Sequence, residues 1–336
     1  MSLRKKHVYV FVLVVLVLAV GVVSSFFLTD WFRKKERVLI YTSTEDYRIA
    51  YLQEKFAEKF PDYVITIEYL STGNHAAKLL AEGRSTDADI TYDLEYGYLE
   101  KLARSGVLAR LSDYYDTSIY TDDTVVSDCY LPTLRNGGAI IVNLDVVEKL
   151  GLPIPTSYED LLKPEYKNLI SMPNPKSSGT GYMFLKSLVN AWGEDKAFDY
   201  FDKLTANILQ YTTSGMGPVS ALVQEEVAIG LGIIANAVTQ INNGVNLKIL
   251  FFDEGAPYSL CGQAIISGKE NRKAVKEVFD FLIHEIGYEN CELFYPEKIF
   301  KDRTFEIANY PTNIKYAEMS NNTIEEKERL LAKWQY

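Results

Sequence analysis

The sequence predicts an α/β protein built as two lobes. Short apolar runs of strand length alternate with stretches whose apolar residues recur at helical spacing, which is typical of a sheet with helices on its faces. This alternation occurs twice, before and after an acidic, tyrosine-rich segment at 111–130 that we expect to be irregular. No long linker separates the two halves, so we expect lobes joined by crossing strands.

The first half of the predicted fold contains three strands and three helices. Val38–Ser43 is apolar and bounded by hydroxyl residues, as a buried strand would be. The next segment places Leu52 and Phe56 on one helical face and stops at Pro61. The expected elements are strands at 38–43, 64–70 and 89–92, and helices at 45–60, 74–82 and 96–105.

The second half repeats this alternation after two glycines, Gly137 and Gly138, that open an apolar strand. Pro173 and Pro175 end a short strand, and Ser177–Gly181 then opens an apolar-periodic helix that runs to Trp192. The other expected elements are strands at 137–143, 169–172, 208–211, 227–234, 247–252 and 263–266, and helices at 145–150, 158–162, 194–204, 219–226, 274–285 and 325–334.

The N-terminus predicts export. Arg4–Lys6 precedes Val8–Leu28, a run of twenty-one residues without a charged side chain. This pattern fits an uncleaved spanning helix or a long signal sequence, and we favour an anchor with the basic end inside the cell. No cysteine lies near the end of the run, so a lipid-modified N-terminus is not expected. The remainder would be extracytoplasmic on a tether at 29–37.

Charge and residue inventory exclude several classes of function. The formal net charge is −10, and the first 37 residues contribute seven Lys or Arg against two acids, so the rest of the chain is strongly acidic. Nucleic-acid binding needs clustered basic residues and is not expected. A hydrolase nucleophile motif, a P-loop and zinc-ligand spacing are all missing from the sequence. We therefore expect no enzyme, cofactor or metal site, and the pairing of Cys129, Cys261 and Cys291 stays open.

Polar clusters follow the predicted strands, each before a helix. Ligands bind at the carboxyl ends of strands in open α/β sheets, so these clusters predict a cleft. The most informative is Ser177–Gly181, because unpaired backbone N–H groups and the helix dipole there suit a small anion. A plain helix cap is the alternative for each cluster alone. The clusters are Thr42–Asp46, Ser71–Asn74, Tyr92–Glu95, Ser177–Gly181, Ser214–Gly217 and Asn236.

The order of these segments resembles the extracellular solute-binding proteins of ABC importers, in the subgroup of ferric-ion, phosphonate and sugar-phosphate receptors. The resemblance covers about 38–310, and its most specific part is Pro155–Pro175 leading into Ser178–Gly181. The other matching segments are 38–43, 89–93, 224–232, 255–258 and 262–266.

The resemblance implies the two-lobed periplasmic-binding-protein fold of class II, with hinge strands between the lobes. By the family's pattern, 38–134 and 263–336 would form lobe 1, 135–262 would form lobe 2, and 1–37 would be the signal or anchor segment and tether. It also implies an ABC permease and ATPase as partners and a monomeric protein. The chain would be exported by, or anchored to the membrane through, residues 8–28.

The resemblance also implies a ligand site. Ferric receptors of this family carry two adjacent tyrosines where this chain has Ala235–Asn236, and Tyr114–Tyr115 lies in the wrong segment to replace them. Ferric binding is therefore disfavoured, whereas the anion-binding turn at Ser178–Thr180 matches. The expected ligand-binding residues are Ser43, Thr44, Glu45, Asp93, Glu95, Ser178, Gly179, Thr180, Ser214, Gly215 and Asn236.

The ligand that we expect is a small anion, such as a phosphonate or a phosphorylated compound. Backbone N–H groups at Ser178–Thr180 would bind the anion, and Asp93, Glu95 or Glu45 would bind an amine or hydroxyl at the other end. Two alternatives stay open. One is a ferric-ion receptor with ligands other than tyrosine, and the other is a membrane-tethered sensor domain.

Overall fold

The computed structural model describes residues 35–336 except 113, 123 and 125–126. The predicted anchor at 8–28 lies outside the described residues. Within the part that is described, no helix is long and apolar enough to cross a membrane. The strands are β1 (Glu36–Thr42), β2 (Tyr63–Tyr69), β3 (Ile90–Glu95), β4 (Leu131–Asn143), β5 (Ile170–Pro173), β6 (Ile208–Thr212), β7 (Ile229–Ile233), β8 (Leu247–Leu250) and β9 (Tyr258–Ile265).

The helices cover both faces of the sheet, and most of them follow the order expected from the apolar periodicity. The helices at Ile234–Asn242 and Gly287–Leu293 were not predicted, and the helix expected at 158–162 is a short 3₁₀ turn at Glu159–Leu162. A π-helical turn at Leu282–Ile286 joins the last two helices before a long irregular segment. The α-helices are α2 (Asp46–Lys59), α3 (Thr72–Glu82), α4 (Tyr96–Arg104), α5 (Leu144–Leu150), α6 (Gly179–Trp192), α7 (Glu194–Leu204), α8 (Gly217–Val223), α9 (Ile234–Asn242), α10 (Lys273–Phe281), α11 (Gly287–Leu293) and α12 (Ile324–Lys333).

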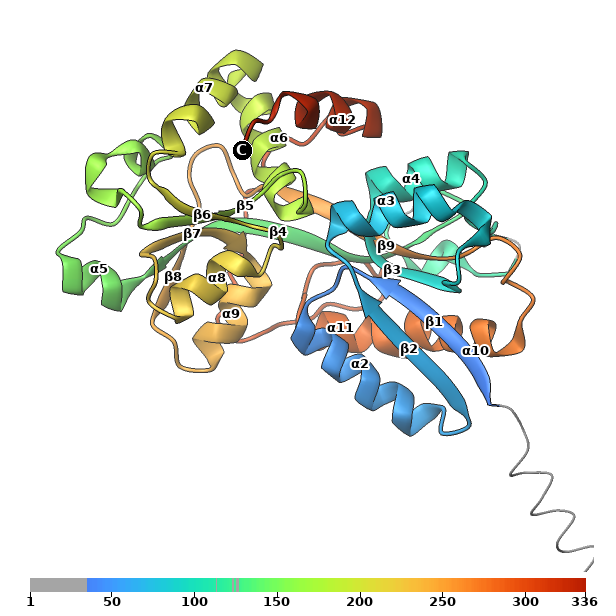
Figure 1. Ribbon diagram of the computed structural model, residues 1–336. Coiled ribbons are helices and arrows are strands. Elements are labelled where there is room, and N and C mark those ends of the chain that lie inside the picture. The colour runs from blue at the N-terminus through green and yellow to red at the C-terminus, as the bar shows by residue number, and fades with distance from the viewer. Residues whose placement is uncertain (1–34, 113, 123, 125–126) are drawn as a thin grey trace, which may run out of the picture.

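One continuous sheet runs through both lobes, as Figure 1 shows. Its strand order is β2-β1-β3-β9-β4-β7-β5-β6, and β8 also pairs with β4. β1 is parallel to β2 and β3, and β5 is parallel to β6 and β7. These two parallel sets are the sheets of lobe 1 and lobe 2, and the antiparallel strands β4 and β9 connect them. The two-lobed class predicted from the sequence is confirmed.

The crossing strands are the hinge of the molecule. The first half of β4 pairs with β9, from Leu131 opposite Gln263 to Gly137 opposite Tyr258. The second half pairs with β7 and β8, and the far end of β9 pairs with β3. β4 begins six residues before the predicted strand, because Leu131–Asn136 includes polar residues that interrupt the apolar run. Of these polar residues, Asn136 borders the space between the lobes and Arg135 pairs with Glu297.

Each lobe has its own hydrophobic core. In lobe 1 the helices α2 and α10 pack Leu52, Phe56, Val278 and Phe279 against β1. In lobe 2 the helix α6 is buried along most of its length, with Met183, Phe184, Leu185 and Leu188 at 0% exposure. A helix that is apolar on nearly every side must be enclosed by other elements, and α6 is covered by α7 and by the sheet.

The part of the chain from Ile307 onward lies largely against lobe 2. Ile307, Tyr310 and Ile314 pack on the α8–α9 side, and Ala317, Met319, Leu330 and Trp334 belong to the core around α6. From the sequence we expected 263–336 to return as a whole to lobe 1. We propose instead that this return ends near Phe305, because Ile299, Phe300 and Phe305 belong to the core of lobe 1, whereas the core contacts from Ile307 onward are made with lobe 2.

Candidate functional site

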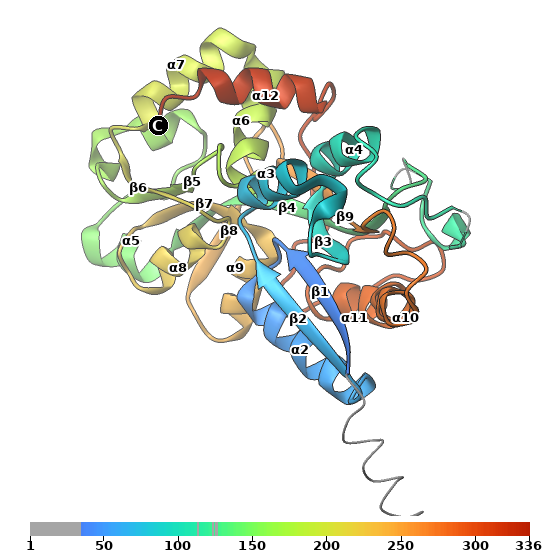
Figure 2. The ribbon, with the colours of Figure 1, turned by 45° about the vertical axis from the view of Figure 1, so that its right-hand side comes forward.

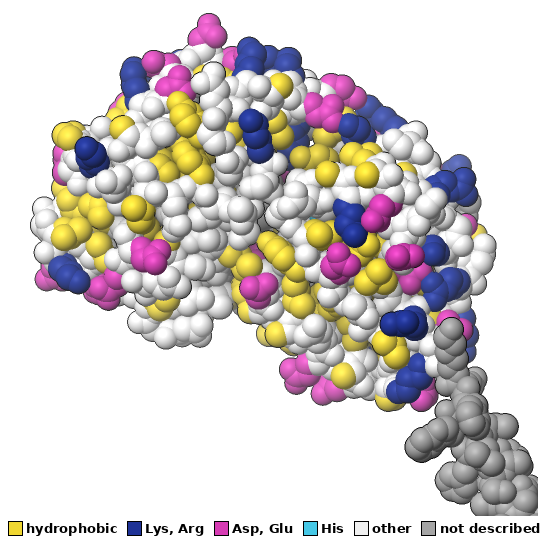
Figure 3. Space-filling model, in the orientation of Figure 1, with side chains coloured by type: hydrophobic (Ala, Val, Ile, Leu, Met, Phe, Trp, Pro, Cys, Tyr) yellow, Lys and Arg dark blue, Asp and Glu magenta, His cyan; other side chains and the backbone are white. Residues whose placement is uncertain are grey.

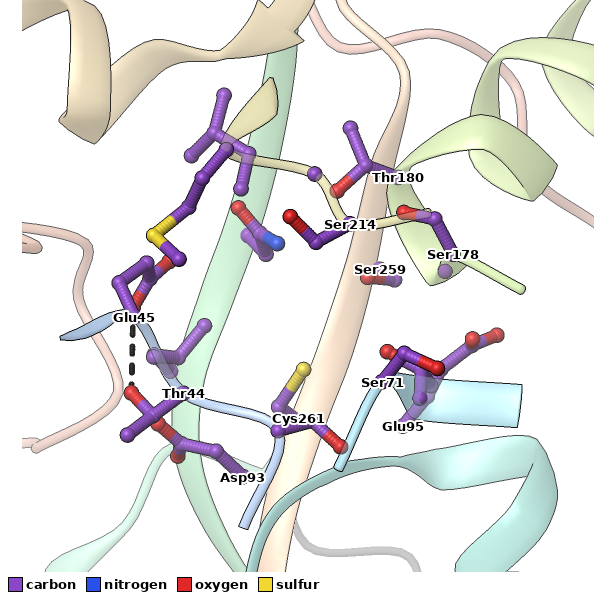
Figure 4. Close-up of a pocket in the computed structure, with 18 of the residues that line it drawn as sticks. Thr44, Glu45, Ser71, Asp93, Glu95, Ser178, Thr180, Ser214, Ser259 and Cys261 are labelled. Carbon is purple, nitrogen blue, oxygen red and sulfur yellow. Dashed lines mark hydrogen bonds between the residues drawn. The ribbon is translucent and has the colours of Figure 1, made fainter. Parts of the chain in front are cut away.

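A polar cleft lies between the lobes at the carboxyl ends of the parallel strands. It encloses about 590 Å³, part of it open to solvent. Figure 3 shows the surface notched between the two halves, and Figure 4 shows the side chains that surround the cavity. Of the eleven predicted ligand-binding residues, the structure brings ten to this cleft: Ser43, Thr44, Glu45, Asp93, Glu95, Ser178, Gly179, Thr180, Ser214 and Gly215.

Asn236 is not among them. It borders a separate hollow between α8 and α9, with Ser220 and Gln240. Asn236 is the third residue of α9, so the rotation of the first helical turn directs it away from the strand end. A strand-end position alone could not show this.

The N-terminus of α6 forms one wall of the cleft. Ser178 is its N-cap residue but makes no capping hydrogen bond, and Ser178 and Thr180 are each only 4% exposed. A Cβ at Gly181 would overlap the Pro173 carbonyl oxygen, so only glycine allows this tight entry into the helix. The free hydroxyls and the first backbone N–H groups of α6 therefore face the cleft together, and they suit an anion.

A second helix N-terminus, that of α3 in lobe 1, lies against the first. Ser71 is the N-cap residue of α3, also without a capping bond, and its buried hydroxyl finds no partner among the described residues. The lobes touch here, because the backbone N–H of Gly73 donates to the Ser177 carbonyl at 3.2 Å. A Cβ at Gly73 would lie 2.6 Å from the Lys176 carbonyl oxygen. The two lobes are therefore closed on each other at this point.

A buried ionic cluster forms the opposite wall. Arg48 Nη1 lies 2.9 Å from Glu45 Oε2 and 2.6 Å from Asp93 Oδ2, and all three side chains are buried. Glu45 also accepts hydrogen bonds from the Tyr295 hydroxyl at 2.5 Å and from Thr44 Oγ1 at 3.1 Å. Burial alone would raise the pKa of Glu45, but Arg48 and Tyr295 outweigh it and hold the pKa below its usual value.

Asp93 is the member of this cluster with room for a ligand. It has a φ of 56°, an uncommon conformation for a residue other than glycine, and it sits at a bulge between Thr91 and Leu94 where β3 slips against β9. Its contact with Arg48 has ion-pair distance but not hydrogen-bond alignment, so neither carboxylate oxygen accepts a hydrogen bond from the described residues. The bulge turns the Asp93 carboxylate toward the cleft, where a hydrogen-bond donor of the ligand would be its partner.

Glu95 lies on the same wall of the cleft as the N-terminus of α6. One of its oxygens would be 3.0 Å from a Cβ at Gly179. The same oxygen forms a short, buried ion pair with Lys327 of α12. From the sequence we expected Glu95 to contact the end of the ligand far from the anion-binding turn, but the structure places it next to that turn.

His75 lies behind the cleft rather than in it. Its two ring nitrogens are 2.8 Å from the Ser43 hydroxyl and 2.9 Å from the Thr91 hydroxyl, and the side chain is completely buried. Burial lowers the pKa of His75 to about 3, so the ring is neutral at physiological pH. It fixes Ser43 at the cleft edge.

The Tyr114–Tyr115 pair lies away from the cleft. Among the described residues, no group of three His, Cys, Asp or Glu side chains is placed to hold a metal ion. Tyr114 is 47% exposed, and the neighbouring Tyr115 ring packs 5.2 Å from the ring of Phe279 in lobe 1. The expectation that this pair does not replace the missing tyrosines agrees with these positions.

The sequence-based prediction missed several residues of the cleft. Arg48 had a local signal, because an arginine three residues after Glu45 lies on the otherwise apolar buried face of α2. Ser71 and Thr72 belonged to a recognised polar cluster but were not selected. Asn136, Ser259, Cys261 and Tyr295 gave no local signal. Ser259 and Cys261 come from the crossing strand β9, and Tyr295 follows α11.

Fold and site together define a two-lobed binding protein whose ligand is enclosed between domains. The family model of the bacterial extracellular solute-binding proteins matches residues 88–334, which is most of the chain. The chain belongs to this family. It is therefore a solute-binding component of an ABC importer and not an enzyme, and it acts outside the cytoplasm.

The chain is similar to several individual proteins. An uncharacterised protein of Haemophilus influenzae is 29% identical over 265 residues, covering 76% of this chain and 75% of its own. A Salmonella typhimurium protein that carries the name of a 2-aminoethylphosphonate-binding periplasmic protein is 25% identical over 231 residues, or 65% of each chain. The structure of the periplasmic binding protein AfuA from Actinobacillus pleuropneumoniae, with bound fructose 6-phosphate, is 26% identical with a TM-score of 0.78, covering 90% of this chain and 98% of that one.

Proposed function

We propose that this protein captures a small phosphonate or phosphorylated compound that also carries an amine or hydroxyl groups, and delivers it to an ABC permease and its ATPase. The N-terminus of α6 and the hydroxyls of Ser178 and Thr180 bind the anionic group. Asp93 accepts a hydrogen bond from the amine or hydroxyl end. The protein works as a monomer, closing its lobes on the ligand about β4 and β9.

The observation that carries this proposal is that the two walls of the cleft offer different hydrogen-bonding groups. One wall offers buried hydroxyls and unpaired N–H groups at two helix N-termini. The other offers the Asp93 carboxylate, which forms an ion pair with Arg48 but accepts no aligned hydrogen bond from the described residues. A ligand with an anion at one end and a donor at the other would satisfy both walls. The 2-aminoethylphosphonate and fructose 6-phosphate of the similar proteins both have this form.

Isothermal titration calorimetry on the full-length protein in mild detergent, stripped of carried-over ligand, tests the proposal. The panel is 2-aminoethylphosphonate, fructose 6-phosphate, inorganic phosphate, spermidine and ferric citrate. We expect binding of at least one of the two organic anions, with a loss of at least about tenfold in the Ser178→Ala/Thr180→Ala double variant because two charge-assisted hydrogen bonds disappear. Ser220→Ala is the matched control, since this hydroxyl is exposed on α8.

Other outcomes would contradict the proposal in different ways. Binding of spermidine alone would show that the carboxylates dominate and that the ligand is a cation. Binding of ferric citrate with a visible tyrosinate absorption band would show an iron receptor. If the wild-type protein bound an organic anion with unchanged affinity in the double variant, the anion would lie elsewhere in the cleft.

A further inference from the structure

The C-terminal helix α12 spans the two lobes on the α6 side of the cleft. Figure 2 shows it lying across the molecule from α7 in lobe 2 toward α4 in lobe 1. Its attachment to lobe 2 is largely apolar, because Leu330 and Trp334 are buried in the core of that lobe and the Trp334 ring lies 5.3 Å from Phe201. Arg329 adds an ion pair with Glu194 of α7. The helix is therefore fixed to lobe 2.

The attachment to lobe 1 is ionic. Glu325 and Glu328 pair with Arg104 and Lys101 of α4, but all four side chains are 36% or more exposed, and exposed pairs of this kind contribute little. The third pair is different, because Lys327 and Glu95 are 3% and 5% exposed. The Lys327 ammonium also lies 4.4 Å from the centre of the Tyr98 ring in lobe 1 and 4.3 Å from the Tyr182 ring in lobe 2.

The position of Glu95 creates an electrostatic problem for the anion site. Its carboxylate lies beside Gly179, the first residue of α6, where the anionic group of the ligand would bind. Two like charges at this separation in a buried site repel each other strongly unless a cation accompanies them. Lys327 is that cation, and it pairs with Glu95 in this structure, in which α12 spans both lobes.

We propose that Lys327 is a positioning residue of the ligand site. It neutralises Glu95 beside the anion-binding turn, and it couples this neutralisation to closure because its helix is fixed to lobe 2. The anionic group of the ligand therefore binds at the N-terminus of α6 when the Lys327–Glu95 ion pair is formed. The charge role of Lys327 rests on the proposed function, because that function supplies the anionic ligand. The coupling of Lys327 to closure of the lobes does not rest on it.

A double-mutant cycle tests the charge role. Calorimetry with 2-aminoethylphosphonate and fructose 6-phosphate is run on the full-length wild type, Lys327→Met, Glu95→Gln and the double variant. We expect Lys327→Met to weaken anion binding by at least about tenfold, since it leaves a buried carboxylate without its partner. In the Glu95→Gln background the same substitution should change the affinity by less than about threefold. Equal losses in both backgrounds would overturn the charge role, because a purely structural lysine would matter equally in each.

The thiol of Cys261 provides a test that needs no ligand. Cys261 lines the cleft and is 9% exposed, so its rate of reaction with a thiol reagent reports opening of the lobes. With Cys129→Ser and Cys291→Ala it is the remaining thiol of the chain. We expect Lys327→Met to raise this rate severalfold, whereas Lys101→Met, which removes an exposed pair of the same helix, should not.

The two tests separate the possible failures. If the wild type binds neither organic anion but Lys327→Met still exposes Cys261, the proposed ligand is wrong and the coupling to closure stands. If the wild type binds an anion and Lys327→Met changes neither the affinity nor the Cys261 rate, the proposed function stands and the role of Lys327 is refuted. Circular dichroism of each variant, and recovery in the double variant, distinguish these results from misfolding.

Discussion

His75 should make the stability of this protein depend on pH below neutrality. Its ring is fully buried between the Ser43 and Thr91 hydroxyls, and burial lowers its pKa to about 3 from the usual 6.5. Because the folded-state pKa is lowered, the unfolded chain takes up a proton that the folded protein does not. The stabilisation is complete above pH 6.5 and is lost progressively as the pH falls toward 3.

The size of this effect follows from the two pKa values. One pH unit within the window corresponds to about 1.4 kcal/mol, so His75 accounts for a loss of about 2.5 kcal/mol in the free energy of unfolding between pH 6 and pH 4. Carboxylates add their own loss in the same range, and a comparison between variants removes that contribution. His75→Gln keeps hydrogen-bonding groups but cannot be protonated in this range.

Urea unfolding followed by circular dichroism at pH 4, 5, 6 and 7 measures the effect. We expect His75→Gln to be less stable than the wild type at pH 7 and to lose about 2.5 kcal/mol less on acidification to pH 4. His284→Gln is the matched control, because that side chain is exposed and should follow the wild-type profile. Identical pH profiles for His75→Gln and the wild type would refute the reasoning.

Two further predictions concern glycines at the helix N-termini beside the cleft. Gly181→Ala should cost about 1–3 kcal/mol of stability, because the new methyl group overlaps the Pro173 carbonyl oxygen. The control Gly97→Ala meets nothing within 4 Å and should stabilise α4 by up to about 1 kcal/mol. Thermal unfolding of the two variants and the wild type measures both effects. Gly73→Ala should leave stability within about 0.5 kcal/mol but hold the lobes apart at the Lys176 carbonyl, so ligand affinity falls and small-angle scattering shows a larger radius of gyration. A Gly73→Ala variant that closes and binds normally would contradict this.

Local sequence patterns were sufficient to predict most of the fold. Buried strands such as β1 and β3 are apolar runs bounded by polar residues, and both features are encoded within a few neighbouring positions. The cleft residues Ser178 and Thr180 were predicted for the same reason, since a hydroxyl-rich turn before an apolar helix is a local signal. The structure places them in the cleft.

The remaining site residues depend on contacts between distant segments. Tyr295 meets Glu45 across 250 positions and Lys327 meets Glu95 across 232, so neither partner can be identified from its neighbours. The sequence around Lys327 would predict an exposed side chain, because a lysine on a charged terminal helix is ordinarily exposed. Asn236 is the opposite case. Its sequence neighbourhood matches the strand-end pattern, but its position on α9 directs the side chain to a separate hollow.

The place of β9 in the sheet has a consequence for how the chain is made. β9 lies between β3 and β4, yet it is synthesised after every strand of lobe 2. Until β9 is available, β3 presents an open strand edge, and such edges promote mispairing and aggregation. Lobe 1 therefore cannot complete its sheet ahead of lobe 2, and an exported chain must keep its first hundred residues from mispairing while the rest follows. The ion pair of Glu95 forms later still, when the C-terminal helix emerges.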